Sequence, residues 1–163
     1  MLRWPDWEST VRVNLCFIIR ERELLLIRKK RGLGAGKVNG PGGKVEPGET
    51  ALESTVREVF EELCVTPLHP ERIGQLYFEF RDGCRLHCEV FVAERFSGEP
   101  QETEEAVPLW TRFDAIPYDE MWEDDRYWLP FVIARQPFRA CFRFDGDRLL
   151  ERRVEAFETA SIR

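Results

Sequence analysis

The chain has 163 residues, 43% of them hydrophobic, which suffices for one substantial core and leaves little room for a second domain. Its formal charge of −6 disfavours proteins that wrap long nucleic acid, because that binding depends on neutralising many phosphates. No run approaches the ~20 apolar residues of a membrane span, and residues 1–10 lack the apolar core of a signal peptide.

The five cysteines are scattered and include no CxxC pair, which favours reduced thiols over a disulfide framework or a zinc ribbon. We therefore expect one domain over residues 1–163, with terminal extensions at 1–10 and 156–163, that works as a monomer in the cytoplasm. Its partner should be a small anionic molecule, and we expect it to bind no nucleic acid polymer and no membrane.

The first predicted elements are two strands and a loop. Apolar runs at 12–20 and 24–27, separated by a charged turn, predict a hairpin. Seven glycines between 32 and 48 then exclude a helix and predict a structured loop with a strand fragment near 44–45. From 50 to 63 the apolar positions recur at helical spacing, which predicts a helix whose buried stripe consists of Leu52, Val56, Val59 and Leu63.

The second half of the chain alternates strands with one helix. Strands are predicted at 73–80, 85–93 and 107–113, and a helix at about 124–135 that Pro130 interrupts or kinks. An Asp-Gly turn closes a final hairpin between 138–144 and 149–154. This order predicts an α/β or α+β fold, with a mixed sheet layered by helices.

Three carboxylates share one face of the predicted helix at 50–63. Glu58 and Glu62 lie about 40° apart on its surface, and Glu61 lies about 60° from Glu58 on the other side. Like charges at these spacings destabilise a helix by about 0.2–0.5 kcal/mol each, so the cluster makes sense if cations neutralise it. Because all the candidate ligands are hard oxygens, Mg²⁺ or Mn²⁺ is favoured over Zn²⁺. The alternative is an ordinary solvated acidic face.

A basic run at 28–31, followed by Lys37 and Lys44, is a second candidate feature, because it would attract phosphates. The alternative is a solvated strand end, which the run taken alone favours.

The window from Gly43 to Val65 resembles the Nudix box, Gly-x5-Glu-x7-Arg-Glu-U-x-Glu-Glu-x-Gly-U, in which U is a large apolar residue. Every charged position is filled. Cys64 replaces the second glycine, where a left-handed backbone is usual, and a non-glycine residue there costs on the order of 1 kcal/mol. The resemblance implies the Nudix fold, a mixed β-sheet sandwiched between helices, and hydrolysis of a phosphoanhydride in a small nucleotide.

The resemblance also implies a catalytic set. Glu49 would hold Arg57 as structural support, and Glu105 matches a distal glutamate that binds metal or acts as a base, with a polar loop residue as the alternative. The general base stays open among Glu61, Glu62 and Glu105. The implied ligands of Mg²⁺, with Mn²⁺ as a substitute, are Glu58, Glu61, Glu62, Glu105 and the backbone carbonyl of Gly43.

Three segments, 29–40, 74–80 and 121–128, resemble one subgroup of this family, the MutT-like oxidised purine nucleoside triphosphatases. That subgroup converts 8-oxo-dGTP and 2-hydroxy-dATP to monophosphates and pyrophosphate, which sanitises the nucleotide pool and serves DNA repair. At three positions the chain differs, with Asn14, Leu33 and Val38 in place of Thr, Phe and Trp. The base pocket implied by the resemblance consists of Asn14, Lys29, Asn39, Phe78, Trp122, Asp124 and Asp125.

Each pocket residue also has a structural interpretation. Phe78 and Trp122 suit stacking on a purine or an ordinary aromatic core, and Asn39 suits a base edge or a turn. Asp124 and Asp125, if buried together, would share a proton and read a base, or they would cap the following helix. Alternative functions are Nudix hydrolysis of another nucleotide, of a nucleoside diphosphate derivative or of an RNA 5′ end, and nucleotide sensing without catalysis.

Overall fold

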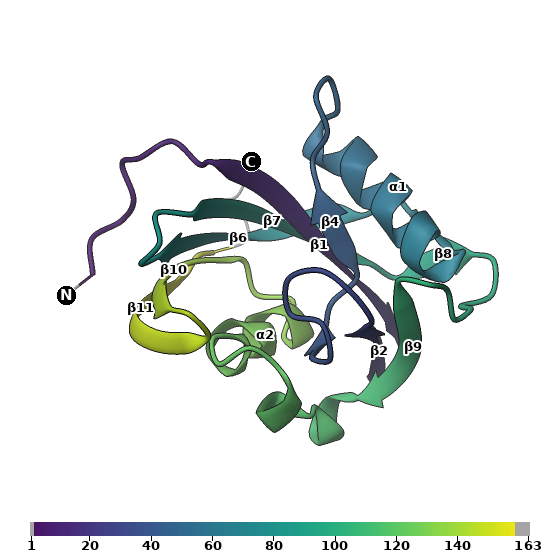
Figure 1. Ribbon diagram of the computed structural model, residues 1–163. Coiled ribbons are helices and arrows are strands. Elements are labelled where there is room, and N and C mark those ends of the chain that lie inside the picture. The colour runs from purple at the N-terminus through teal and green to yellow at the C-terminus, as the bar shows by residue number, and fades with distance from the viewer. Residues whose placement is uncertain (1, 159–163) are drawn as a thin grey trace.

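The structure is a computed structural model that describes residues 2–158 (Figure 1). Within these residues, one mixed sheet contains β1 (Val11–Arg20), β2 (Glu23–Lys29), β3 (Val38–Asn39), β4 (Gly42–Lys44), β6 (Glu71–Phe80), β7 (Arg85–Ala93), β9 (Ala106–Arg112), β10 (Phe138–Asp145) and β11 (Arg148–Ala156). The strand order is β11-β10-β6-β7-β1-β2-β3, with β4 paired to β1 and β9 paired to β2. β1 and β7 pair in parallel, as do β6 and β10, and the other neighbours are antiparallel.

The remaining elements lie around this sheet. β5 (Thr66–Leu68) and β8 (Arg95–Ser97) form a separate two-stranded ribbon in the described chain. Two short 3-10 turns, η1 (Phe113–Ala115) and η2 (Tyr118–Glu120), lead from β9 towards the second helix. The helices α1 (Ala51–Leu63) and α2 (Asp125–Ile133) lie on opposite sides of the sheet (Figure 1).

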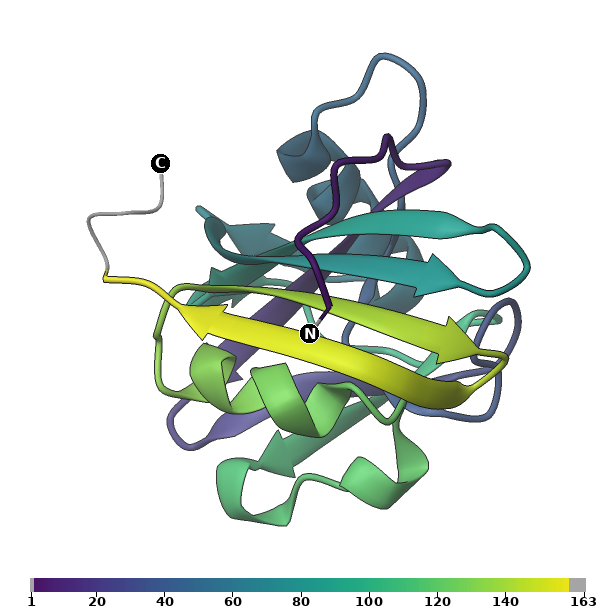
Figure 2. The same ribbon diagram turned by 90° about the vertical axis from the view of Figure 1, so that its left-hand side faces the viewer.

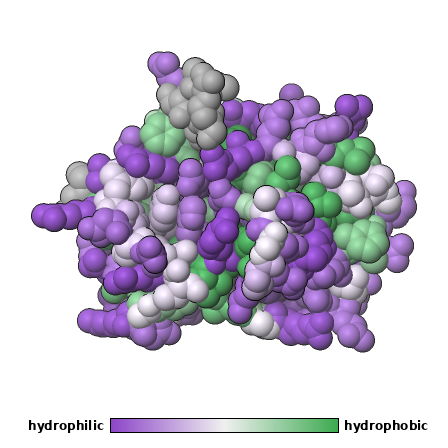
Figure 3. Space-filling view, turned by 90° about the horizontal axis from the view of Figure 1, so that it is seen from above, coloured by the Kyte–Doolittle hydropathy of each residue, from purple (hydrophilic) through white to green (hydrophobic). Residues whose placement is uncertain are grey.

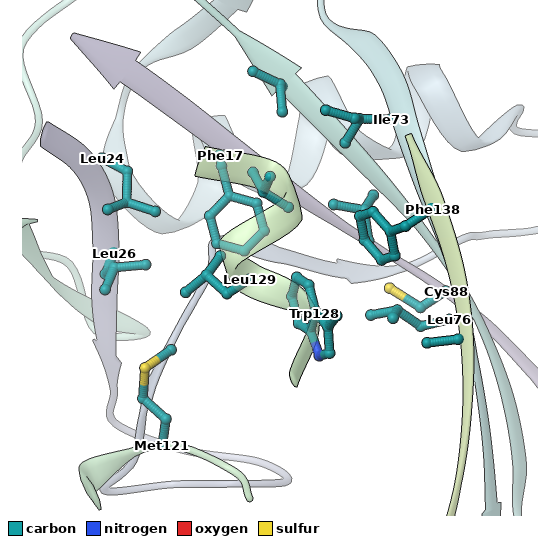
Figure 4. Packing of buried hydrophobic residues seen from close by; sticks show 14 of the residues in the cluster. Phe17, Leu24, Leu26, Ile73, Leu76, Cys88, Met121, Trp128, Leu129 and Phe138 are labelled. Atoms are coloured by element: carbon teal, nitrogen blue, oxygen red, sulfur yellow. The ribbon is translucent and has the colours of Figure 1, made fainter. Parts of the chain in front are cut away.

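The sheet is buried on both faces at β1 and β2, which explains their continuous apolar runs. Along β1, Phe17 packs into the core beneath α2, whereas Cys16 and Ile18 pack into the core beneath α1. Leu24 and Leu25 of β2 divide between the two cores in the same way. Figure 4 shows the core on the α2 side, where side chains from β1, β2 and β10 meet Trp128 and Leu129. Alternation along two strands therefore supplies two hydrophobic layers.

Most predicted elements are confirmed with shifts of one to three residues at their ends. The sequence analysis missed β3, β5 and β8, which have two or three residues each and are too short for a periodic pattern. Of the two effects expected from Pro130, an interruption or a kink, the interruption is absent, because α2 runs continuously from Asp125 to Ile133. Pro130 removes only one backbone donor from this helix.

The predicted buried stripe of α1 was partly wrong. Val59 and Leu63 are buried, but Leu52 is 44% exposed, and Figure 3 shows hydrophobic residues on the surface over this helix. The buried face instead includes the small polar residues Ser54 and Thr55, together with Glu62. Ser54 donates to the carbonyl of Lys44, so this face of the helix makes a polar contact with β4.

The segment before β1 crosses the outer face of the sheet (Figure 2). Trp4 stacks against the guanidinium of Arg139, with 3.9 Å from Arg139 Cζ to the ring centre, and Trp7 packs edge-on against Tyr77. Of the expected terminal extensions, residue 1 and residues 159–163 lie outside the described residues. Within residues 2–158, no helix is long and apolar enough to cross a membrane.

Replacing Cys64 with glycine should stabilise the protein. Cys64 ends α1 in the left-handed conformation, with φ of 63°, as expected from the position that it occupies in the box. A side chain in this region costs roughly 1 kcal/mol, so Cys64→Gly should raise the free energy of unfolding by about that amount and Tm by about 2–4 °C. Urea and thermal denaturation would measure both. Cys64→Ala removes the thiol but keeps the strain, and an equal gain in that control would contradict the explanation.

Candidate active site

The acidic side of α1 lies directly against the glycines of β4. The backbone N–H of Gly42 donates to Glu62 Oε1 at 2.7 Å. A Cβ atom at Gly43 would stand only 2.3 Å from the Glu58 carboxylate, and one at Gly42 would stand 2.0 Å from the carbonyl oxygen of Asn14. Glycine is therefore required at Gly42, because the backbone of β1 fills the space of a side chain, whereas a side chain at Gly43 would displace the carboxylate of Glu58.

Arg57 links the glutamates of this region. Its guanidinium binds Glu49 through two bonds of 2.7 and 2.8 Å, and its Nη1 donates to Glu58 at 2.9 Å and to Glu61 at 3.2 Å. Hydrogen bonding to Arg57 lowers the pKa of Glu49 to about 2. The expected Glu49–Arg57 support is thus present as a geometry, and it holds Arg57 between Glu58 and Glu61.

Two of the carboxylates are held away from water. Glu62 is 3% exposed, and burial raises its pKa to about 8. Burial also raises the pKa of Glu58. The charge of Glu105 acts on both glutamates in the same direction, because it reaches them from the loop before β9. One buried and one half-buried carboxylate, both with raised pKa values, form a site that a bound cation would stabilise.

The donor set fits a hard divalent cation, since it consists of carboxylate oxygens and a backbone carbonyl. In the described chain, however, no three His, Cys, Asp or Glu side chains lie close enough together to hold a metal ion without rearrangement. The oxygens of Glu58 and Glu61 accept hydrogen bonds from Arg57, and one oxygen of Glu62 accepts one from Gly42. A cation would have to compete with these donors.

A cavity opens beside the acidic cluster, under the loop between β2 and β3. It reaches Gly42, Gly43 and Glu62 at one end. The sequence analysis missed several apolar lining residues, including Phe80, Cys88 and Phe144, because only strand pairing shows that they face the same space. All seven residues predicted for the base pocket line this cavity: Asn14, Lys29, Asn39, Phe78, Trp122, Asp124 and Asp125.

The cavity wall carries polar atoms that have no partner among the described residues. They are Asn14 Oδ1, Asn39 Nδ2 and Asp125 Oδ2, each buried. Buried polar atoms are nearly always hydrogen-bonded, because an unsatisfied one costs about 1–3 kcal/mol. Three such atoms from three different segments therefore equip the cavity wall for hydrogen bonds with a polar ligand or with water.

The two aspartates do not cap α2 with their side chains. Asp124 makes no side-chain capping bond, and its Oδ2 accepts from Trp128 Nε1 at 2.7 Å. Burial raises the pKa of Asp124 to about 6, and burial with the neighbouring Asp124 charge raises that of Asp125 well above its ordinary value. Asp124 is thus held as an acceptor, whereas the raised pKa of Asp125 favours its protonated form, which has a proton to donate.

The basic run does not form the free phosphate patch that one interpretation of the sequence suggested. Arg28 pairs with Glu120 at 2.7 Å, Lys30 with Glu102 at 2.6 Å and Arg31 with Glu105 at 3.3 Å. Lys29 differs, because it lines the cavity and its Nζ donates to the carbonyl of Leu33. Alternation along β2 separates Lys29 from Arg28, and Lys30 and Arg31 lie beyond the end of the strand.

The model of the NUDIX domain family matches residues 9–132. The chain belongs to this family. It is 40% identical to the oxidized purine nucleoside triphosphate hydrolase of Mus musculus over 157 residues, covering 91% of this chain and 99% of the relative. Identity to the enzyme of the same description from Danio rerio is 39% over 150 residues, covering 90% of this chain and 95% of that one.

The fold comparison agrees with the family. A MutT protein from Bacillus halodurans superimposes with a TM-score of 0.80 at 28% identity, covering 89% of this chain and 97% of that one. The Nudix fold and a hydrolase of this family, both expected from the sequence, are thereby confirmed. Nudix hydrolases generally use divalent cations, which is consistent with the oxygen donors on α1.

Glu62 should make the stability of the metal-free protein fall as the pH rises. A carboxyl whose pKa is raised by folding binds its proton more tightly in the folded than in the unfolded state. The free energy of unfolding therefore decreases as the pH rises from 4.5, the ordinary pKa of the group, to about 8, its pKa in the folded protein. In EDTA, Glu62→Gln should flatten this slope, which is at most about 1.4 kcal/mol per pH unit for one group. Urea denaturation across the window measures it. Glu58 titrates in the same direction, so some slope should remain.

The matched control is Glu53→Gln, on the same helix. Glu53 completes the capping box by accepting from the Thr50 N–H, and glutamine preserves that bond. This control should keep the wild-type slope. Identical slopes in Glu62→Gln and wild type would contradict the assignment of the buried proton to Glu62.

Proposed function

We propose that the protein hydrolyses oxidised purine nucleoside triphosphates, such as 8-oxo-dGTP and 2-hydroxy-dATP, to the monophosphate and pyrophosphate with Mg²⁺ as cofactor. The observation that carries the proposal is one continuous cavity, with unpartnered polar atoms on its wall and Glu62 with Gly43 at its end. The substrates named for the mouse and zebrafish relatives support the same choice.

The cavity residues would bind and orient the base. Phe78 and Trp122 offer aromatic faces for stacking, which is worth roughly 1–3 kcal/mol per base in comparable sites. Neutral Asp125 would donate to a keto oxygen or ring nitrogen, and Asn39 offers a second donor through its unpartnered Nδ2. A base held in this way directs its phosphates towards Lys29, Gly43 and Glu62, which line the same cavity.

The glutamates of α1 would hold the metal and the attacking water. In this proposal Glu58, Glu61 and Glu62 are ligands together with the carbonyl of Gly43, and Glu105 is a ligand or base. Mg²⁺, or Mn²⁺ in its place, would neutralise phosphate oxygens and lower the pKa of a water. Arg57, anchored by Glu49, would keep Glu58 and Glu61 in place. Glu61, Glu62 and Glu105 are the candidates for the general base.

We further propose that the protein works as a monomeric single domain, residues 1–163, on free nucleotides in the cytoplasm. The cavity and the glutamates beside it come from one chain, which supports a site that needs no second copy. The net charge of −6 disfavours long nucleic acid as a partner, and the five cysteines are unpaired, as in a reducing compartment.

Pyrophosphate release tests the proposed reaction. With Mg²⁺, 8-oxo-dGTP and 2-hydroxy-dATP should be cleaved faster than dGTP and dATP, and EDTA should abolish release. Glu62→Gln should lower kcat at least about 100-fold, because it removes a charged ligand, whereas Glu53→Gln should stay near wild type. Equal rates on all four nucleotides would exclude the preference for oxidised bases. Full activity of Glu62→Gln would exclude its ligand role.

Asp125 should control the preference among purines through its proton. Asp125→Asn keeps a neutral donor, so its kcat/KM for 8-oxo-dGTP should remain within about threefold of wild type. Asp125→Leu keeps a similar volume without a donor and should lose about tenfold or more, mainly through KM. Steady-state kinetics would separate these outcomes. Equal losses in both variants would show that the site needs the carboxylate and not its proton.

A further inference from the structure

Asn14 and Ser54 form a buried polar pair between β1 and α1. Asn14 is 1% exposed and Ser54 fully buried, and the amide Nδ2 of Asn14 donates to Ser54 Oγ at 2.8 Å. Ser54 Oγ in turn donates to the carbonyl oxygen of Lys44 at 3.0 Å. Asn14 also lines the cavity, and its Oδ1 is buried without a partner in the described chain.

The hydrogen count of this chain fixes the orientation of the amide. A serine hydroxyl has a single hydrogen, and Ser54 uses it to donate a hydrogen bond to the backbone carbonyl of Lys44. Towards Asn14, Ser54 Oγ can therefore only accept. Only the NH₂ end of the amide is able to donate. The oxygen of Asn14 is therefore left as the polar atom without a partner, and it is an acceptor without a proton of its own.

The geometry points to Asn14 as a specificity-determining residue that accepts a hydrogen bond from an N–H group of the purine, and to Ser54 as the positioning residue that orients it. This inference rests on the proposed function. The chemistry recognised is an N–H donor on the base. 8-Oxoguanine has three such groups, of which N1–H is shared with unmodified guanine and with hypoxanthine. We assign Asn14 to one of the two groups that differ among purines: the exocyclic amino group, or the N7–H that oxidation creates where unmodified guanine has an acceptor nitrogen.

The position of Ser54 ties this orientation to the acidic cluster. Ser54 lies one helical turn before Glu58 on α1. The Lys44 carbonyl that accepts the hydrogen bond of Ser54 also accepts one from Arg57 at 3.1 Å. A displacement of α1 from β4 would thus disturb the glutamates and release the amide of Asn14 together. The side chain of Ser54 acts on the base only through Asn14.

Ser54→Ala is the direct test, with kcat/KM measured for two nucleotide pairs. The pair 8-oxo-dGTP and 8-oxo-dITP differs in the exocyclic amino group, and the pair 8-oxo-dGTP and dGTP differs in N7–H and the 8-oxo group. The wild type should discriminate within at least one pair. Ser54→Ala should reduce that discrimination about fivefold, the value of one neutral hydrogen bond, through KM and with kcat nearly unchanged.

Two further variants complete the experiment. Asn14→Leu removes the acceptor and should lower the ratio of kcat/KM values within the same nucleotide pair by at least as much. This variant tests the role of Asn14 if Ser54→Ala fails to fold. Thr55→Val is the matched control, because it removes the neighbouring fully buried hydroxyl, which has no partner within the described residues. It should leave both ratios at wild-type values.

The outcomes separate this inference from the proposed function. A wild type that cleaves 8-oxo-dGTP, with ratios unchanged in Ser54→Ala and Asn14→Leu, overturns the inference alone. If Ser54→Ala loses the same factor in kcat/KM on every nucleotide, Ser54 has only a structural role, and the inference is again overturned. A wild type that cleaves no purine triphosphate overturns both. A fall in one ratio identifies which N–H group Asn14 accepts.

Discussion

The contact between α1 and the glycines of β4 is the constraint on which the site depends. No side chain separates the two elements at Gly42 and Gly43, so the carboxylate of Glu58 occupies the place of a Cβ and Glu62 accepts directly from the backbone of β4. Arg57 and Ser54 strengthen the same contact through the carbonyl of Lys44. The acidic face and the end of the cavity are both set by this close approach.

This arrangement places charge where hydrophobic burial alone would not. Glu62 faces inward from the helix and has a raised pKa because water is excluded, while the more apolar Leu52 and Phe60 are exposed. Arg57 offsets part of the repulsion between Glu58 and Glu61. A site of this kind gives up stability in the metal-free state, and function accounts for that cost.

β1 connects the two halves of the site. Its alternating residues serve two cores, and Asn14 has the same parity as Cys16 and Ile18, which face α1. Asn14 therefore reaches Ser54 while it borders the cavity that also contains Asp124 and Asp125. The strand thus joins the helix that carries the glutamates to the pocket proposed for the base.

The sequence by itself determined the elements and the chemistry of the box, because these depend on spacing within short segments. The helix at 50–63 and the shared side of Glu58 and Glu61 follow from local geometry, and the left-handed Cys64 follows from its position in the box. The residues of the pocket were named by family resemblance, and they line one cavity, but their roles stay proposals.

Only the tertiary structure decided which atoms are buried and which are paired. Part of the buried face of α1 was mispredicted, because the apolar residues do not show that Ser54, Thr55 and Glu62 are buried while Leu52 is exposed. The pairing of Arg31 with Glu105, the missing side-chain cap at Asp124 and the orientation of Asn14 join residues 40 or more positions apart or depend on burial. No periodic pattern in the chain encodes such contacts, because they exist only once distant strands and the helix pack together.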